Sequence, residues 1–138
     1  MRSPIQALCN LLVKTILLAT ACSCQAVFTD ATLKPAVTSW CAGAIGPDFT
    51  SSTFTVHGSI TTWDVSAVTS MLDLFRDRAT CNPDLSGWNT AMVETMYGMF
   101  RGAASFNQAV PFDTSSVITM QAMFLRATSF NQAVPFDT

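Results

Sequence analysis

A chain of 138 residues has room for one domain once a segment removed during export is subtracted. Hydrophobic residues make up 49% of the sequence, charged residues only 12%, and the formal net charge is −2. The sequence shows no basic stripe and no cluster of Lys or Arg to neutralise phosphates, which argues against nucleic acid as a partner.

Residues 1–26 have the organisation of a secretory signal peptide. Arg2 and Lys14 supply positive charge, residues 16–21 are apolar, and small residues lead to a cleavage point after Ala26. A membrane-spanning helix is the competing interpretation, but the apolar run is shorter than the roughly 20 residues that a bilayer requires. Lipid anchoring at Cys22, which loosely resembles a bacterial lipoprotein site, is a further alternative. We expect a secreted or cell-surface protein without a transmembrane span after processing.

The mature chain predicted from this cleavage carries five positive and nine acidic residues, a net charge of −4. It keeps two cysteines, Cys41 and Cys81. Two cysteines are too few for a disulfide framework but enough for one bridge in an oxidising compartment. The alternative is that each is a buried thiol that packs as a small hydrophobic residue.

An amphipathic helix is predicted over residues 32 to about 42, with Thr32 as the N-cap and Pro35 in the first turn. The apolar positions that follow helical spacing are Leu33, Ala36, Val37, Trp40 and Cys41. Residues 43–58 are rich in Gly, Pro, Ser and Thr and form a connection. Residues 27–62 are therefore expected to be an N-terminal capping helix and a loop that precede the repeats.

A repeat with a period of 24 or 25 residues occupies the rest of the chain, and each unit opens with an aromatic residue. The stretch SFNQAVPFDT occurs unchanged at residues 105–114 and 129–138. The units are residues 63–87, 88–111 and 112–135, with the start of a further unit at 136–138. Repeats of this length indicate a solenoid, whose units bury their apolar faces by stacking on one another.

Each unit contains three apolar residues at i, i+3 and i+4, which predict one face of a short helix. These residues are Met71, Leu74 and Phe75, then Met96, Met99 and Phe100, then Met120, Met123 and Phe124. The Asp or Asn that follows each opening aromatic should cap this helix or form the turn before it. Those residues are Asp64, Asn89, Asp113 and Asp137.

A short run later in each unit, such as Ala109-Val110, is compatible with a brief strand that Pro111 and Pro135 keep short. The sequence therefore predicts an α/β repeat solenoid of the leucine-rich-repeat type, with one short helix and one short strand per coil. The methionines, at helical spacing, are expected to belong to the core.

The nine residues 63–71, WDVSAVTSM, followed by Met-Phe and then Ser-Phe-Asn-Gln in later units, resemble the BspA-type repeat of bacterial surface proteins. That repeat is also seen in mycoplasma surface lipoproteins and in predicted secreted proteins of unicellular algae. The resemblance covers residues 63–138 and implies a leucine-rich-repeat-like solenoid outside the cell, used for adhesion or protein interaction, without catalysis. Unit one departs from the pattern, because Cys81 stands where later units have Phe106 and Phe130.

No motif predicts a catalytic, cofactor-binding or metal-binding residue, and we expect no cofactor. His57 is the only histidine and has no Ser, Asp or Cys motif near it. The two mature cysteines are not paired at C-x-x-C spacing, as a zinc site would require. An Asn recurs once per unit and is expected to be buried and to hydrogen-bond the backbone of the neighbouring unit. These residues are Asn82, Asn107 and Asn131.

The predicted function is that of a non-catalytic interaction or adhesion module, secreted or on the cell surface, that binds an unidentified protein or glycan. One alternative is a truncated fragment of a longer surface protein with no activity of its own, and another is a secreted enzyme fragment. The last unit would leave Phe130, Val134 and Phe136 uncovered. This predicts self-association through that end of the stack.

Overall fold

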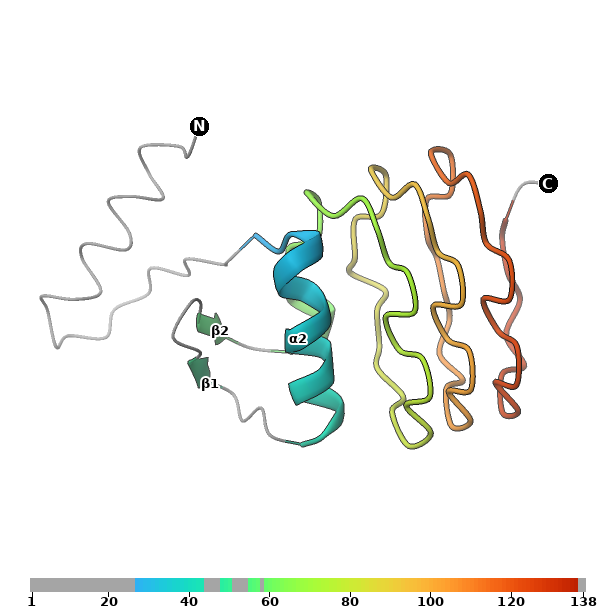
Figure 1. Cartoon of the computed structure of the whole chain (residues 1–138), viewed down its shortest axis with the longest axis horizontal. Coiled ribbons are helices and arrows are strands. Elements are labelled where there is room, and N and C mark those ends of the chain that lie inside the picture. The colour runs from blue at the N-terminus through green and yellow to red at the C-terminus, as the bar shows by residue number, and fades with distance from the viewer. Residues whose placement is uncertain (1–26, 44–47, 51–54, 58, 137–138) are drawn as a thin grey trace, which may run out of the picture.

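The computed structural model describes residues 27–43, 48–50, 55–57 and 59–136, so the predicted signal peptide and Cys22 lie outside the described residues. One helix, α2 (Asp30–Cys41), covers one end of a stack of three repeat units (Figure 1). Of the helices in the described ranges, none has the length and hydropathy needed to cross a bilayer.

Two short strands and a single helical turn connect α2 to the repeats. Strands β1 (Asp48–Thr50) and β2 (Thr55–His57) form an antiparallel pair in which Phe49 lies opposite Val56. A 3₁₀ helix, η1 (Ile60–Thr62), follows, and its N-cap Ser59 accepts a hydrogen bond from the amide of Thr61. This turn buries Ile60 immediately before the first repeat unit.

The N-cap of helix α2 lies three residues before the predicted one. Thr29 is the N-cap, and its amide donates to Oγ1 of Thr32 at 2.9 Å, which is one half of a capping box. Pro35 consequently lies in the second turn rather than the first. The apolar face is as predicted: Leu33, Ala36 and Val37 are buried, with Trp40 and Cys41 partly buried against the same core.

The predicted α/β repeat solenoid is wrong. Residues 63–136 contain no α-helix and no strand, only turns, single bridge residues and irregular segments. The units are joined by isolated parallel bridges, Ser70 with Thr95 and Thr95 with Thr119. Turns that are hydrogen-bonded to the neighbouring unit therefore replace the predicted helix of each coil, and irregular backbone replaces the predicted strand at Ala109-Val110.

Hydrogen bonding between the units explains the absence of a helix. Alternate amides in the first unit donate to carbonyls of the second, at N···O distances of 2.7 to 2.9 Å: Met71 to Thr95, Asp73 to Tyr97, Phe75 to Met99 and Asp77 to Arg101. The intervening amides donate three residues back within their own unit, as Leu74 does to Met71. An α-helix would instead bond each amide to the carbonyl four residues earlier.

Left-handed backbone at two positions per unit also excludes a helix. The φ angles are 51° and 57° at Asp73 and Asp77, 59° and 71° at Gly98 and Gly102, and 59° and 64° at Ala122 and Arg126. Helical residues require negative φ throughout. The i, i+3, i+4 spacing of the apolar residues thus arises from two successive turns, each closed by a left-handed residue.

Glycine at position 122 is expected to stabilise the protein. A non-glycine residue at positive φ is strained, so Ala122→Gly should raise the free energy of unfolding by about 0.5–1 kcal/mol. The matched control is Ala133→Gly, at an exposed position without positive φ, where added chain freedom should lower stability instead. Urea unfolding of the two variants measures the difference, and a loss of stability in both would contradict the assignment of strain to Ala122.

Stacked aromatic rings form the centre of the core. Phe75, Phe100 and Phe124 occupy equivalent positions in the three units, with ring centroids 5.3 and 5.5 Å apart. A second column contains Phe106 and Phe130 at 5.8 Å, and Phe106 lies 3.8 Å from Phe100. Met71, Met96, Met99 and Met123 are buried beside these rings, whereas Met92 is 60% exposed.

The turn predicted after each opening aromatic is present. Oδ1 of Asp64, Asn89 and Asp113 accepts a hydrogen bond from the amide two residues later, at 3.1, 3.2 and 3.0 Å. Of the two roles predicted for these residues, the turn is therefore correct and the helix cap is not. Asp137 lies outside the described residues.

Helix α2 takes the place of a preceding repeat unit. Oδ1 of Asp30 accepts from the amides of Thr69 and Ser70 at 2.8 and 3.0 Å, and Lys34 Nζ donates to the carbonyl of Leu72 at 3.3 Å. At the other end of the helix, the Sγ atoms of Cys41 and Cys81 are bonded, with the Cα atoms 5.4 Å apart. Helix α2 therefore satisfies part of the backbone of the first unit on the side that no repeat covers.

Asp30 is expected to make this contact pH-dependent. Burial disfavours its charged form, but hydrogen bonds from Ser70 and Thr69 outweigh that effect and hold the pKa of Asp30 below its ordinary value of 3.8. Because the pKa is lower in the folded state, the stabilisation is complete above the unfolded pKa and is lost as the pH falls through the folded pKa.

We therefore expect Asp30→Asn to lower the free energy of unfolding by about 1 kcal/mol or less at neutral pH, since the carboxylate is largely exposed. The difference between the two proteins should shrink below about pH 4. Glu94→Gln, which removes an exposed carboxylate, is the control. Denaturant titrations at several pH values test this, and a difference that grows on acidification would have the wrong sign.

Candidate functional site

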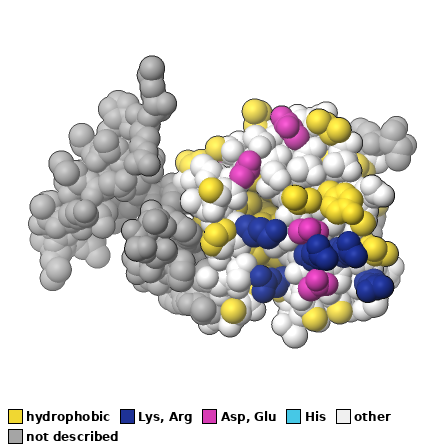
Figure 2. All heavy atoms as spheres, viewed as in Figure 1, with side chains coloured by type: hydrophobic (Ala, Val, Ile, Leu, Met, Phe, Trp, Pro, Cys, Tyr) yellow, Lys and Arg dark blue, Asp and Glu magenta, His cyan; other side chains and the backbone are white. Residues whose placement is uncertain are grey.

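One side of the molecule, formed by α2 and the stacked turns, carries every Lys and Arg in the described part of the chain. These five residues, which we name the arginine face, are Lys34, Arg76, Arg78, Arg101 and Arg126. Figure 2 shows the Lys and Arg side chains gathered on one side of the molecule, with acidic side chains between them. Because the rest of the described chain is acidic, this side differs in charge from the remaining surface.

The stacking of the units places these residues next to one another. The amide of Asp77 donates to the carbonyl of Arg101 at 2.7 Å, and the amide of Gly102 donates to the carbonyl of Leu125 at 2.8 Å. Backbones paired in this way lie about 5 Å apart. Arg101 therefore lies opposite Arg76 of the first unit and Leu125 of the third, and Arg126 follows Leu125 directly.

Three of the five cations form hydrogen bonds or ion pairs with neighbouring groups. Arg76 is paired with Asp73 and Asp77, with N···O distances of 3.1 and 3.3 Å. The hydrogen bond and the negative charge of Asp73 raise the pKa of Arg76 above its ordinary value. Arg78 donates to Oγ1 of Thr38 at 2.8 Å, and Lys34 donates to a backbone carbonyl as described above.

Arg101 and Arg126 differ from these three. Their guanidinium groups have no hydrogen bond or ion pair to any residue in the described ranges. Arg101 is half-buried and Arg126 is exposed. A guanidinium group presents five donors that suit carboxylate, sulfate and phosphate groups, so these two side chains are available for an anionic ligand.

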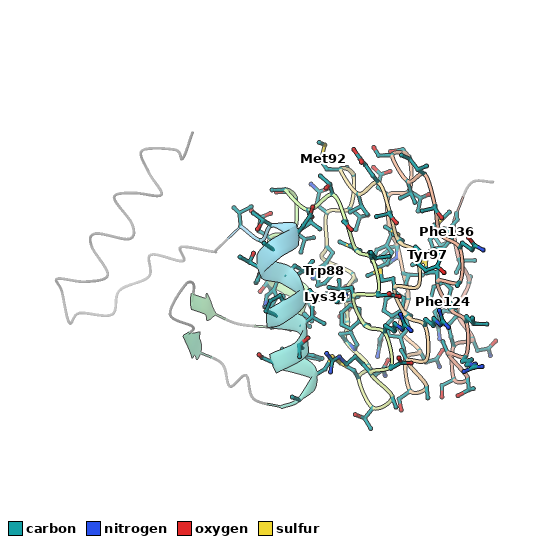
Figure 3. All side chains as sticks on the ribbon, in the orientation of Figure 1. Lys34, Trp88, Met92, Tyr97, Phe124 and Phe136 are labelled. Carbon is teal, nitrogen blue, oxygen red and sulfur yellow. A yellow bond between two sulfur atoms is a disulfide. The ribbon has the colours of Figure 1, made fainter. Side chains whose placement is uncertain are left out.

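Tyr97 adds an aromatic ring to the same side of the stack. The register places it between Leu72 and Gln121, since Asp73 donates to its carbonyl and Gly98 donates to that of Gln121. Figure 3 shows Tyr97 and Lys34 on this side. Gly98 has no side chain, and a Cβ atom there would collide with Oδ1 of Asp73, so the two units approach closely beside the ring. Tyr and Arg are among the residue types that are enriched at binding hot spots.

The recurring asparagines form a hydrogen-bonded ladder, as predicted, but at the surface. Oδ1 of Asn82 accepts from the amide of Asn107, and Oδ1 of Asn107 accepts from the amide of Asn131, both at 2.9 Å. All three residues are exposed, so the prediction that they are buried is wrong. Their bonds to the neighbouring unit support a structural role.

The remaining residues weighed from the sequence are His57, Cys41 and Cys81. His57 is the last residue of β2. Within the described ranges, no group of three or more His, Cys, Asp or Glu side chains could hold a metal ion. Cys41 and Cys81 are joined to each other and tie α2 to the first unit.

The family described as "Mycoplasma protein of unknown function, DUF285" matches residues 44–137, from just before β1 through the third repeat unit. It is a BspA-like surface repeat family, so the match bears out the broad resemblance and extends it toward the N-terminus. No curated protein and no solved structure matches the chain. The chain therefore belongs to the DUF285 family of BspA-like repeat proteins.

Proposed function

We propose that this protein is a non-catalytic interaction module, secreted or displayed on the cell surface, that binds an acidic protein or an acidic glycan through the arginine face. The observation that carries the proposal is the pair Arg101 and Arg126, whose guanidinium groups have no partner in the described part of the chain. The family, a group of surface repeat proteins, supports a location outside the cell.

Charge supports an anionic ligand. The arginine face carries five positive charges, and two acidic residues, Asp73 and Asp77, lie among them. A protein whose overall charge is negative attracts few anions non-specifically, so binding should depend on this one surface. Association should also weaken as the salt concentration rises, because exposed charges are screened.

The test compares two double variants that change the net charge equally. Arg101→Gln with Arg126→Gln removes two positive charges from the arginine face, whereas Met92→Glu with Ile118→Glu adds two negative charges at residues that are 60% and 83% exposed. Titration calorimetry against a sulfated polysaccharide, polyglutamate and neutral dextran measures the affinity of each protein.

The arginine variant is expected to lose affinity for one of the acidic polymers at least about tenfold, as the loss of one good charged contact would produce. The glutamate variant should bind nearly as well as the original protein, and dextran should not bind. Equal losses in the two variants would mean that only net charge matters, and this would contradict a site on the arginine face.

A further inference from the structure

Gly102 separates two opposite charges on the arginine face. The amides of Asp77 and Gly102 donate to the carbonyls of Arg101 and Leu125 at 2.7 and 2.8 Å. Gly102 therefore lies opposite Asp77 of the first unit and Arg126 of the third, and all three residues have left-handed backbone. Paired backbones are about 5 Å apart, so those of Asp77 and Arg126 are separated by about 10 Å. This row carries a negative side chain at one end, a positive one at the other and none between them.

The carboxylate of Asp77 is exposed and only partly used within the protein. The side chain is 73% exposed, and its Oδ2 accepts from Nε of Arg76 at 3.3 Å. Its Oδ1 accepts from no group in the described ranges and lies over Gly102, where a Cβ atom would collide with it. Because an ionised carboxylate can accept several hydrogen bonds, Asp77 keeps acceptors free for a cationic ligand group.

The charges that are open to a ligand are therefore divided between the units. In the first unit Arg76 is paired with both Asp73 and Asp77, and the carboxylate of Asp77 remains exposed. In the second and third units, the guanidinium groups of Arg101 and Arg126 are unpaired among the described residues. Arg101 directly precedes Gly102, so free positive charge begins where the negative charge of Asp77 ends.

We propose that the arginine face selects a protein segment of mixed charge and that Asp77 determines this selectivity. The inference rests on the function proposed above. An acidic side chain of the segment binds Arg101 and Arg126, and a basic side chain about two to four residues away donates to Asp77, since an extended chain rises about 3.3 Å per residue.

Asp77 also disfavours a dense polyanion. A ligand with acidic groups at every position would place one of them against Asp77, and repulsion between like charges weakens such a complex. A sulfated glycan offers no cationic group to Asp77. The row therefore favours a protein partner over a glycan.

Three blocked peptides of equal length test the proposal by titration calorimetry at low salt, where exposed charges are least screened. They consist of repeats of Glu-Ser-Ser-Lys, Glu-Ser-Ser-Gln and Glu-Ser-Ser-Glu. The lysine peptide is expected to bind about two- to fivefold more tightly than the glutamine peptide, as one exposed charge pair produces. It should also bind more tightly than the glutamate peptide, which is more negative.

A pair of variants with equal net charge assigns the preference to Asp77. Asp77→Asn removes the carboxylate beside Gly102, and Asn tolerates the positive φ of this position. The preference for the lysine peptide should disappear, and the glutamate peptide should bind about two- to fivefold more tightly than it binds the original protein. Glu94→Gln removes an exposed carboxylate outside the arginine face and should keep the original preferences.

The outcomes separate this inference from the function on which it rests. An unchanged preference in Asp77→Asn, or equal changes in the two variants, overturns the role of Asp77. Binding of the acidic peptides that depends on Arg101 and Arg126 but shows no preference for lysine overturns this inference and leaves the proposed function intact. The same holds if only the sulfated polysaccharide binds, whereas no binding of either kind of ligand overturns both.

Discussion

Replacing Phe100 by alanine is expected to lower the free energy of unfolding by about 3–5 kcal/mol. The ring of Phe100 is fully buried and lies between those of Phe75 and Phe124, with a further stacked contact to Phe106. Its removal leaves a cavity at the point where all three units meet. Because small domains have a total stability of about 5–15 kcal/mol, this one change should unfold a substantial fraction of the molecules near body temperature.

Urea unfolding followed by tryptophan fluorescence measures this loss. Met92→Ala is the matched control, because it also shortens an apolar side chain but at a residue that is 60% exposed. Exposed truncations usually change stability by no more than about 0.5 kcal/mol. A similar decrease in the free energy of unfolding of both variants would show that the stacked aromatic rings do not stabilise the fold as expected.

The repeat period and most of the core could be predicted from the sequence, because both follow from which residue types recur. Val68 and Val93 are fully buried in the structure. Their counterpart Val117 is only partly buried, since the third unit has no neighbour on its far side among the described residues. Burial thus depends on position in the stack, which the repeat pattern alone does not contain.

The local conformation could not be predicted in the same way. Apolar residues at i, i+3 and i+4 fit either one turn of helix or two successive β-turns, and helix is the commoner result. Gly98 and Gly102, four residues apart, were a signal of left-handed backbone. The signal does not recur with the repeat, because Asp73, Asp77 and Ala122 occupy equivalent positions in the other units. The hydrogen bonds that select the turns come from a unit 24 or 25 residues away.

The arginine face was missed because it is not contiguous in the sequence. Arg76, Arg101 and Arg126 are separated by 25 residues each, close to one repeat period. A search for neighbouring cations finds three isolated residues, whereas stacking places Arg76 opposite Arg101 and places Arg126 one residue beyond the position opposite Arg101. The spacing itself was therefore the available signal, and it becomes informative only when the period of the repeat is applied to charged residues as well as to apolar ones.

The second large effect is expected from the bond between Cys41 and Cys81. These residues are 40 positions apart, and their Cα atoms lie 5.4 Å from each other. In the chain-entropy account, a cross-link over a loop of this length stabilises the folded state by about 4 kcal/mol. It ties the C-terminal end of α2 to the first unit, while Asp30 holds the other end.

Cys41→Ala with Cys81→Ala should therefore unfold at a lower urea concentration, with a loss of up to about 4 kcal/mol, and chemical reduction of the original protein should produce a similar loss. Reduction should leave the free energy of unfolding of the double variant unchanged. This control separates the effect of losing the disulfide from any effect of the alanine side chains. A thiol count on the unfolded, unreduced mature protein is expected to find none free. Two free thiols would show that α2 is held to the stack by its hydrogen bonds and apolar face alone.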